Sequence, residues 1–486
     1  QSTADGTFTV GESDIVMDQG TKIMLHLKDS CLDYLNYDRL KSIIVRHSNF
    51  ISYPIKLYHN YDKDVSDSDD SDEEVNKDEC PEKEEAPKKT KKVSVTEWEH
   101  INTQKPIWTR NPEDVTEKEY IDFYRTLTGD TIGEPYAWKH FKVEGNVEFS
   151  AILYIPSKTP DDKFNHKFKN NIKLYVKRVF IMDDSRELLP EEYFEFMVGV
   201  IDSEDLPLNI SREILQQNRI TNVIHKHIVK KTISMMQSLL DDDRYVYNIF
   251  WDKFKKYIKL GIVDDNEYYR DKLMRLCLFN TQQNKMLTLS EYVYNMPKKQ
   301  QDIYFLAGEN SDTVKSSPFL EPMNKLGYDV LYMIDSIDEY IVQRVTEFDG
   351  KNMVSCCRTD IKYDFDEEMD RYEKDKTYNE LCDYMTDVLH KHKANIQKVV
   401  IGNHTITTPC VIVTGEYGWT GNMERIIRAQ AIQNDTFLPE DLTSIYLEIN
   451  PKHKLIKDLK RGYDENKDMD SLIRLLYDTS KLNSGY

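Results

Sequence analysis

Apolar residues occupy every second position in two segments of the chain, a spacing that is typical of β-strands. The segments are EFSAILYIP, with Phe149, Ala151, Leu153 and Ile155, and NIKLYVKRVF, with Ile172, Leu174 and Val176. A shorter alternation of Ile23, Leu25 and Leu27 precedes a helix-like stretch, CLDYLNYDRLKSIIVRH. These patterns predict a small structured piece near the N-terminus and a strand-containing domain further along the chain.

Helical spacing dominates the segments around these strands. Thr116 and Glu119 fit a capping box that opens the helix TEKEYIDFYRTL. From Leu206 onward, apolar residues recur at helical intervals in a long amphipathic stretch that includes Leu215, Val223, Ile224, Ile228 and Leu239. Strands mixed with long helices in this order predict an α/β or α+β domain.

A second boundary is predicted at residues 356–378, which are mostly polar and charged. Beyond them the pattern predicts a helix in LCDYMTDVLHKH, a strand pair in KVVIGN and CVIVTGEYG, and helices in NMERIIRAQAI and DSLIRLLYDTS. We therefore expect a smaller α+β domain at this end of the chain. The predicted fold class is thus multidomain, with α/β and α+β parts.

Residues 61–95 contain almost no large apolar side chains and change from an acidic to a basic block. Such a segment cannot bury enough surface to offset the entropy lost on ordering, so it is predicted to be a disordered charged linker. The 486 residues exceed the size of a single core, which indicates two or three domains.

The formal net charge of −20 argues against nucleic acid or an acidic membrane as a partner. No apolar run approaches the length that spans a bilayer. The seven cysteines form no CxxC pair and are interpreted as reduced thiols of an intracellular protein. Because the first residues resemble no signal peptide and lack an initiating Met, we expect the chain to begin inside a longer protein.

The segment LPLNISREILQQNRI carries the most informative chemistry. Asn209 or Ser211 can cap a helix whose first turn contains Arg212, and Gln216 lies four residues further on the same face. A helix start with an arginine suits a phosphate group. The alternative is that Arg212 pairs with a nearby carboxylate and has no other role. Neither a GxxxxGK[ST] loop nor a GxGxxG loop after a strand is present, so the chain shows no nucleotide site of its own.

Two aromatic residues in polar surroundings are candidate contacts for an apolar partner, namely Trp108 in KPIWTRNP and Phe164 in DDKFNHKFKNN. For Trp108, a place in the core is an equally good interpretation. The histidine pairs His225 with His227 and His390 with His392 have no Cys or carboxylate at ligand spacing, so no metal site is predicted.

Motifs throughout the chain resemble the heat shock protein 90 family of molecular chaperones: GTKIMLHLK, RHSNFISYPI, KPIWTRNPEDVTEKEY, KHFKVEGNVEF, NNIKLYVKRVFIMD, IDSEDLPLNISREILQQN, IKLGI, SSPFLE, IDEY and YGWTGNMERIIRAQA. The resemblance covers nearly everything outside the linker. It implies that residues 1–60 are the end of an N-terminal GHKL-type ATPase domain, 61–95 the charged linker, 96–355 a middle domain, and 356–486 a C-terminal dimerisation-type domain, truncated at its end.

The same resemblance implies an ATP-dependent chaperone that folds and matures client proteins and binds unfolded ones. In such a protein Arg212 contacts the γ-phosphate of ATP and Gln216 supports the closed state, while Trp108 contacts clients. We list Phe164 as a second client-binding candidate. ATP with magnesium is expected in the full-length protein, an ATPase, and none is expected on this fragment, which should be inactive alone.

Expected partners are client proteins and co-chaperones on the middle domain. A homodimer is implied for the parent protein and left open for this chain. The predicted location is the cytoplasm, with the endoplasmic reticulum lumen as the alternative. The rival function is a nucleotide-independent holdase or co-chaperone scaffold.

Overall fold

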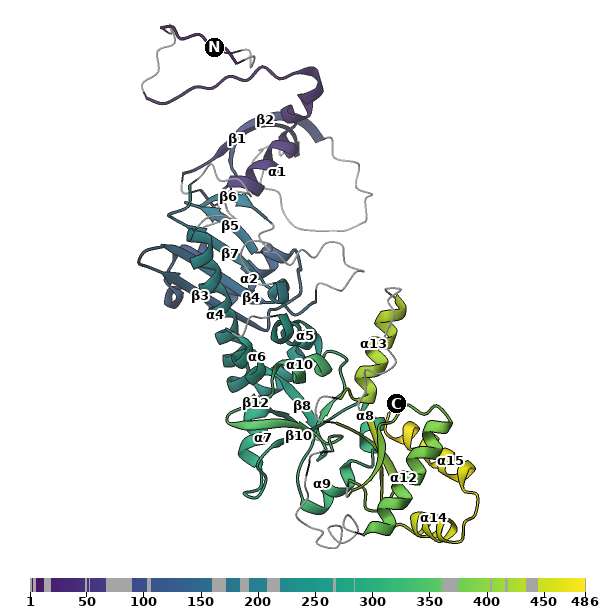
Figure 1. Cartoon of the computed structure of the whole chain (residues 1–486). Helices are drawn as coiled ribbons and strands as arrows, with labels where there is room; N and C mark the ends of the chain where they lie inside the picture. The colour runs from purple at the N-terminus through teal and green to yellow at the C-terminus, as the bar shows by residue number, and fades with distance from the viewer. Residues whose placement is uncertain are drawn as a thin grey trace, which may run out of the picture. The chain divides into compact units, whose positions relative to one another are not determined.

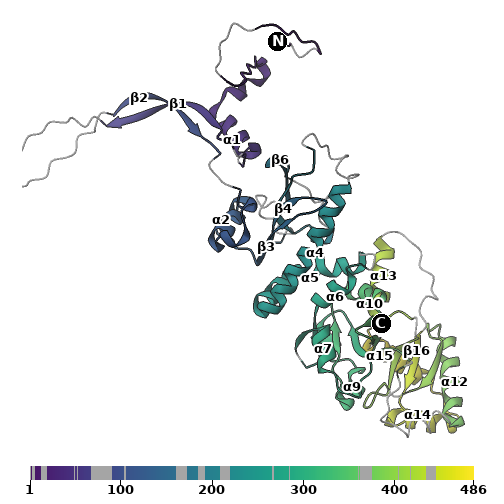
Figure 2. The same ribbon diagram turned by 90° about the vertical axis from the view of Figure 1, so that its left-hand side faces the viewer.

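The computed structural model describes residues 2, 6–12, 19–48, 50–51, 53–66, 90–102, 106–159, 172–183, 192–207, 219–264, 268–283, 285–359, 361, 375–402, 404–415, 418–433 and 445–485 (Figures 1 and 2). Contacts divide the chain into two compact units. The first unit is Gln1–Ile107 with Tyr175–Ile181, and the second is Trp108–Leu174 with Met182–Tyr486.

The first unit is built on a long antiparallel strand pair. Its elements are η1 (Asp29–Leu35), α1 (Tyr37–Ser48), β1 (Lys56–Ser66) and β2 (Thr90–His100). The buried Asn102 closes the base of the pair, because its amide nitrogen donates to the carbonyl oxygens of Ile51 and Tyr53, both at 2.8 Å. Its amide oxygen accepts from the Ile55 N–H at 2.7 Å.

Two predictions for this unit are wrong. Both ends of the expected linker 61–95 are strands, since β1 and β2 pair from Lys56 with His100 to Ser66 with Thr90. Ladder hydrogen bonds join backbone groups and need no apolar side chains, so the composition gave no sign of them. Residues 67–89 lie outside the described residues. The strand expected at Ile23–Leu27 does not form, and Ile23 and Leu25 are exposed.

The second unit begins with the predicted helix α2 (Glu117–Thr128), and Thr116 and Glu119 form the predicted capping box. The elements that follow are β3 (Ala137–Val143), β4 (Phe149–Ile155), η4 (Glu192–Phe194), β7 (Val198–Ser203), α4 (Arg219–Asp242) and α5 (Arg244–Asp264). Antiparallel pairing joins β3 to β4 and β4 to β7. The predicted strand β5 (Ile172–Val176) and the strand β6 (Val179–Met182), which was not predicted, are divided between the two units.

A six-stranded sheet in the order β12-β13-β10-β11-β8-β9 follows. Its strands are β8 (Leu278–Thr281), β9 (Met286–Thr288), β10 (Ile303–Ala307), β11 (Leu331–Met333), β12 (Glu347–Phe348) and β13 (Lys351–Ser355). The helices of this region are α6 (Arg270–Leu276), α7 (Leu289–Asn295), α8 (Ser311–Lys315), α9 (Leu320–Leu326) and α10 (Asp338–Arg344). Parallel pairs of β10 with β11 and β13 form its centre.

The last sheet has the order β14-β16-β15. The elements of this part are α12 (Lys376–Lys391), β14 (Lys398–Ile401), β15 (Cys410–Thr414), α13 (Gly421–Gln433), β16 (Ile445–Ile449), α14 (Lys454–Asp464) and α15 (Asp470–Asn483). The predicted strands β14 and β15 exist, but the expectation that they pair is wrong. β16 lies between them, parallel to β14 and antiparallel to β15.

β15 is packed on both of its faces. Cys410 and Ile412 belong to a core with α12, α14 and α15. Val411 and Val413, on the opposite face, belong to a core with residues of β10, α9 and β11. Successive side chains of a strand point to opposite faces, so one strand of five residues joins the two layers.

No boundary between compact units lies at residues 355/356. Cys356, Cys357 and Ile361 are buried in the same core as Val411 and Val413. Separate middle and C-terminal domains therefore stay a prediction. The mixed α/β and α+β fold class is confirmed. No described helix is long and apolar enough to cross a membrane. The described cysteines form no disulfide.

A single carboxylate adds a polar tie between α9 and the loop that leads into β15. The Glu321 carboxylate accepts hydrogen bonds at 2.5–3.0 Å from the N–H groups of Ile406 and Thr407 and from the hydroxyls of Thr407 and Thr408. Partial burial by itself raises the pKa of Glu321, but these hydrogen bonds leave it below the ordinary value of 4.5. The ionised form therefore stabilises the fold.

We predict that Glu321→Gln lowers the free energy of unfolding at pH 7 by roughly 1–3 kcal/mol, the range for hydrogen bonds to a charged group. Because the folded-state pKa is depressed, this stability is present above about pH 4.5 and is lost as the pH falls through the folded value. Urea denaturation from pH 7 to pH 3 should show the two proteins converging. The exposed control Glu347→Gln should leave stability unchanged at every pH, and a constant difference for Glu321→Gln would contradict the assignment.

Candidate functional site

Three of the four residues predicted from the sequence as site residues, Arg212, Gln216 and Phe164, lie outside the described residues. The fourth, Trp108 on η2 (Ile107–Thr109), is only 1% exposed. Its indole nitrogen donates to the Asp202 carboxylate at 2.9 Å, and its ring packs against Phe123. The core interpretation of Trp108 is therefore confirmed, and its contact with a client stays a prediction.

The described residues contain a cavity of about 860 Å³ elsewhere in the second unit. It lies between strands β10 and β13 of the six-stranded sheet, helix α10, the end of β15 and the start of α13. A volume of this size is in the range of sites that hold a ligand or several side chains. Its walls come from residues 299–361 and 414–423.

Part of the cavity lining is apolar and aromatic. Trp419 and Met423, four residues apart, line it where α13 begins. Met423 is 4% exposed and Trp419 is partly exposed. The other apolar lining residues are Phe305, Leu326, Val342, Met353, Val354 and Ile361. A large, partly exposed aromatic side chain beside a hollow, backed by a buried methionine, favours contact with apolar groups of many shapes.

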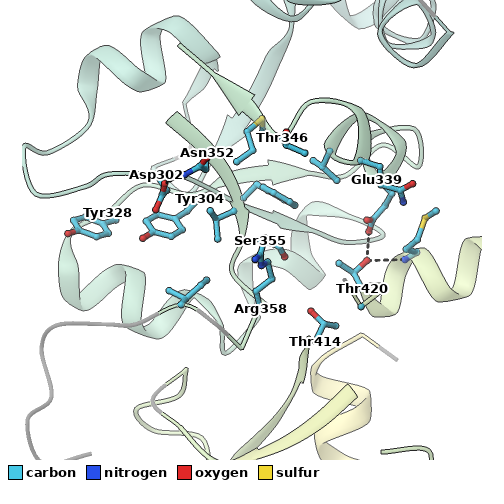
Figure 3. A pocket seen from close by; sticks show the side chains of 18 of the residues that line it. Asp302, Tyr304, Tyr328, Glu339, Thr346, Asn352, Ser355, Arg358, Thr414 and Thr420 are labelled. Atoms are coloured by element: carbon cyan, nitrogen blue, oxygen red, sulfur yellow. Dashed lines mark hydrogen bonds between the residues drawn. The ribbon is translucent and has the colours of Figure 1, made fainter. Parts of the chain in front are cut away.

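The rest of the lining is polar and includes positively and negatively charged side chains (Figure 3). At one end the rings of Tyr304 and Tyr328 lie parallel, with centroids 5.9 Å apart. Above them the Asn352 amide donates to the Asp302 carboxylate at 3.0 Å. Arg358 lies near the middle, below Ser355. These groups can hydrogen bond to the backbone or polar side chains of a bound chain.

The opposite end of the cavity holds a buried carboxylate, that of Glu339 on α10. It accepts hydrogen bonds from the Thr420 hydroxyl at 2.7 Å and the Asn422 amide at 3.0 Å. Burial raises the pKa of Glu339 above its ordinary value. The carboxylate thus joins α10 directly to the first residues of α13.

No group of three or more His, Cys, Asp or Glu side chains that could hold a metal occurs among the described residues. Burial also raises the pKa values of the nearby thiols Cys356 and Cys357, the latter to about 12, so at neutral pH both are protonated and poorly nucleophilic.

Sequence reasoning missed this site. The helix NMERIIRAQAI was predicted, but Trp419 and Met423 were not singled out as site residues. The available signal was a tryptophan between two glycines immediately before a helix, with a methionine one turn later. The facing residues, such as Val342 and Tyr304, are distant in sequence and gave no signal.

Comparisons with known proteins agree with this fold. A family model described as Hsp90 protein matches residues 33–486. Heat shock protein 90-6, mitochondrial, from Arabidopsis thaliana is 40% identical over 497 aligned residues, which cover 99% of this chain and 61% of that protein. Endoplasmin homologs from Hordeum vulgare and Arabidopsis thaliana are 35% and 36% identical, covering 100% of this chain and 65% and 64% of those proteins. The chain therefore spans less than two thirds of the length of each of these relatives.

These relatives correct one expectation. The predicted cytoplasmic type and location are wrong, because the names of the relatives are those of a mitochondrial protein and of endoplasmins. The resemblance seen in the sequence is confirmed at the level of the family, since the family model covers nearly the whole chain. The chain belongs to the Hsp90 protein family.

Proposed function

We propose that this chain is the client-holding part of a molecular chaperone of the heat shock protein 90 type, and that the cavity beside α13 binds segments of unfolded client proteins. The observation that carries the proposal is the position of Trp419 and Met423 on the wall of an open cavity of about 860 Å³. Unfolded chains expose apolar side chains next to unpaired backbone groups. The cavity lining offers apolar side chains to the first and polar groups to the second.

The mixed lining also explains why many clients would be accepted. Met423 adapts its shape, because methionine is unbranched and has several rotatable bonds. Trp419 presents a large surface with few rotatable bonds, so holding an apolar side chain costs it little entropy.

In the whole protein we propose that ATP controls client binding. By the family resemblance, Arg212 contacts the γ-phosphate and Gln216 supports the closed state. Both lie in the stretch 208–218, outside the described residues, so the support for these roles is the sequence alone. Bound ATP with magnesium would supply the γ-phosphate whose charge an arginine at a helix start stabilises.

We further propose an organellar location, the endoplasmic reticulum lumen, in line with the endoplasmin homologs. Co-chaperones on the middle domain and a homodimer remain proposals drawn from the resemblance. The location can be tested by following a fluorescent fusion of the full-length gene product. Retention in mitochondria instead would agree with the other relative and overturn the lumenal assignment.

The cavity should be tested with Trp419→Ala and Met423→Ala. Removing a central aromatic anchor typically costs about 2 kcal/mol or more, so we expect binding of an unfolded protein to weaken by about tenfold or more. The measurement is fluorescence anisotropy with labelled, reduced and carboxymethylated α-lactalbumin as a permanently unfolded probe. Leu475→Ala is the control, because Leu475 is 62% exposed on α15 and does not line the cavity. Equal losses in all three variants would contradict the assignment.

The role of Arg212 needs a separate test in a chain that includes the nucleotide-binding domain. We expect Arg212→Ala to slow ATP turnover by about 10³-fold, by analogy with other arginines that stabilise phosphoryl transfer. Arg212→Lys should recover only part of the rate, since an ammonium group lacks the planar fork of a guanidinium. Unchanged turnover in Arg212→Ala, with client binding equal with and without ATP, would favour a nucleotide-independent holdase.

A further inference from the structure

The start of α13 depends on a hydroxyl that makes two hydrogen bonds. Thr420 is the residue just before α13, and its hydroxyl oxygen accepts from the Met423 N–H at 3.1 Å, which caps the helix. The same hydroxyl donates its hydrogen to the Glu339 carboxylate at 2.7 Å (Figure 3). A hydroxyl has a single hydrogen, so Glu339 fixes the direction of that hydrogen and leaves a lone pair facing Met423.

A second hydrogen bond to Glu339 comes from the first turn of α13. The Asn422 amide nitrogen donates to the same carboxylate oxygen at 3.0 Å. The amide oxygen of Asn422 accepts from Arg425 at 2.6 Å, and Arg425 also pairs with Glu309 at 2.6 Å. The first turn of α13 is therefore tied to α10 and to the loop after β10.

The other end of α13 contacts the neighbour of Glu339. The Gln430 amide donates to the Tyr340 hydroxyl at 2.9 Å. Two consecutive residues of α10 thus bind Thr420, just before α13, and Gln430, near its other end, and the two helices lie beside each other in both views (Figures 1 and 2). This pair of contacts fixes the direction of α13 as well as the position of its first turn.

α10 is itself anchored to α5 by a buried ion pair. Lys259 on α5 and Asp338, the residue before Glu339, are 3% and 1% exposed, and their charged atoms are 2.6 Å apart. Lys259 also contacts the Asp335 carboxylate at 2.7 Å. Burial by itself lowers the pKa of Lys259, but Asp338 and Asp335 hold it above its ordinary value. The lysine therefore stays charged and keeps α10 against α5.

Stability alone does not account for a carboxylate at position 339. The side chain is 2% exposed, its hydrogen-bond donors are neutral, and Asp338 lies next to it. Burying a charge among neutral partners usually makes the folded state less stable than a well-packed neutral side chain would. A carboxylate at this position is better explained by its hydrogen bonds to Thr420 and Asn422, which hold the start of α13 in place.

We propose that Glu339 is a positioning residue for client binding: it holds Thr420 and Asn422 so that α13 begins where Trp419 and Met423 line the cavity. This inference rests on the proposed function, since it assigns to Glu339 the geometry of that client site. Lys259 and Asp338 set the place of Glu339, which makes α5, α10 and α13 one connected support.

The test compares Glu339→Leu, which removes the acceptor at similar volume, with Glu339→Gln, which keeps an acceptor oxygen and loses the charge. We expect Glu339→Leu to weaken binding of carboxymethylated α-lactalbumin by about tenfold, as for loss of an anchor, and Glu339→Gln to recover most of it. The exposed Glu347→Gln on β12 is the matched control and should bind normally. Thermal unfolding of each variant is measured alongside.

A spectroscopic readout separates positioning from general destabilisation. The contribution of Trp419 to fluorescence is obtained by subtracting a Trp419→Phe version of each variant. Its emission should shift in Glu339→Leu and return in Glu339→Gln. If Glu339→Leu stays folded with unchanged binding and unchanged Trp419 emission, the proposal is overturned.

If Glu339→Leu does not fold, Thr420→Val decides, because it removes only the hydroxyl that connects Glu339 to α13. Weaker binding of the probe by Thr420→Val supports the proposal, and unchanged binding contradicts it. The underlying function fails differently: if Trp419→Ala and Met423→Ala bind the probe normally, the cavity is not the client site, whatever Glu339 does. If those two variants bind the probe weakly and Glu339→Leu binds it normally, the positioning role of Glu339 is rejected while the client site stands.

Discussion

The burial of β15 on both faces is the constraint on which the second unit depends. Four of its five residues alternate between two cores, one shared with α12, α14 and α15 and the other with β10, α9 and β11. A shift of one residue in its register would exchange the two sets of side chains. The register therefore fixes where β15 ends, and the chain that leaves it reaches Trp419 and α13 within a few residues.

Hydrogen bonds to carboxylates fix the directions of segments that apolar packing leaves undetermined. Apolar packing is non-directional, so it brings α13 near α10 without fixing its direction. The contacts of Glu339 with Thr420 and Asn422 are directional, and they fix where the helix begins. Glu321 does the same for the loop before β15. Carboxylates from the six-stranded sheet region thus hold both segments that flank β15.

Local signals in the sequence predicted local structure well. The capping box of Thr116 and Glu119 and the alternation in EFSAILYIP act within a few residues, and α2 and β4 form as expected. Pairing over long distances was not predictable in this way. The two strands KVVIGN and CVIVTGEYG were expected to pair because they follow each other, yet β16 inserts between them. The family was correctly identified from its motifs, whereas the cavity was not, because its walls come from distant segments and Glu339 resembles a surface residue in IDEY.

The most direct test of the account is amide hydrogen exchange of the chain with and without carboxymethylated α-lactalbumin. The account predicts slower exchange on binding in residues 418–433 and in β13, which border the cavity, and no change in α15, whose exposed Leu475 and Leu482 lie outside it. Protection of α15 with none at the start of α13 would contradict the central claim that clients bind in the cavity between α10 and α13.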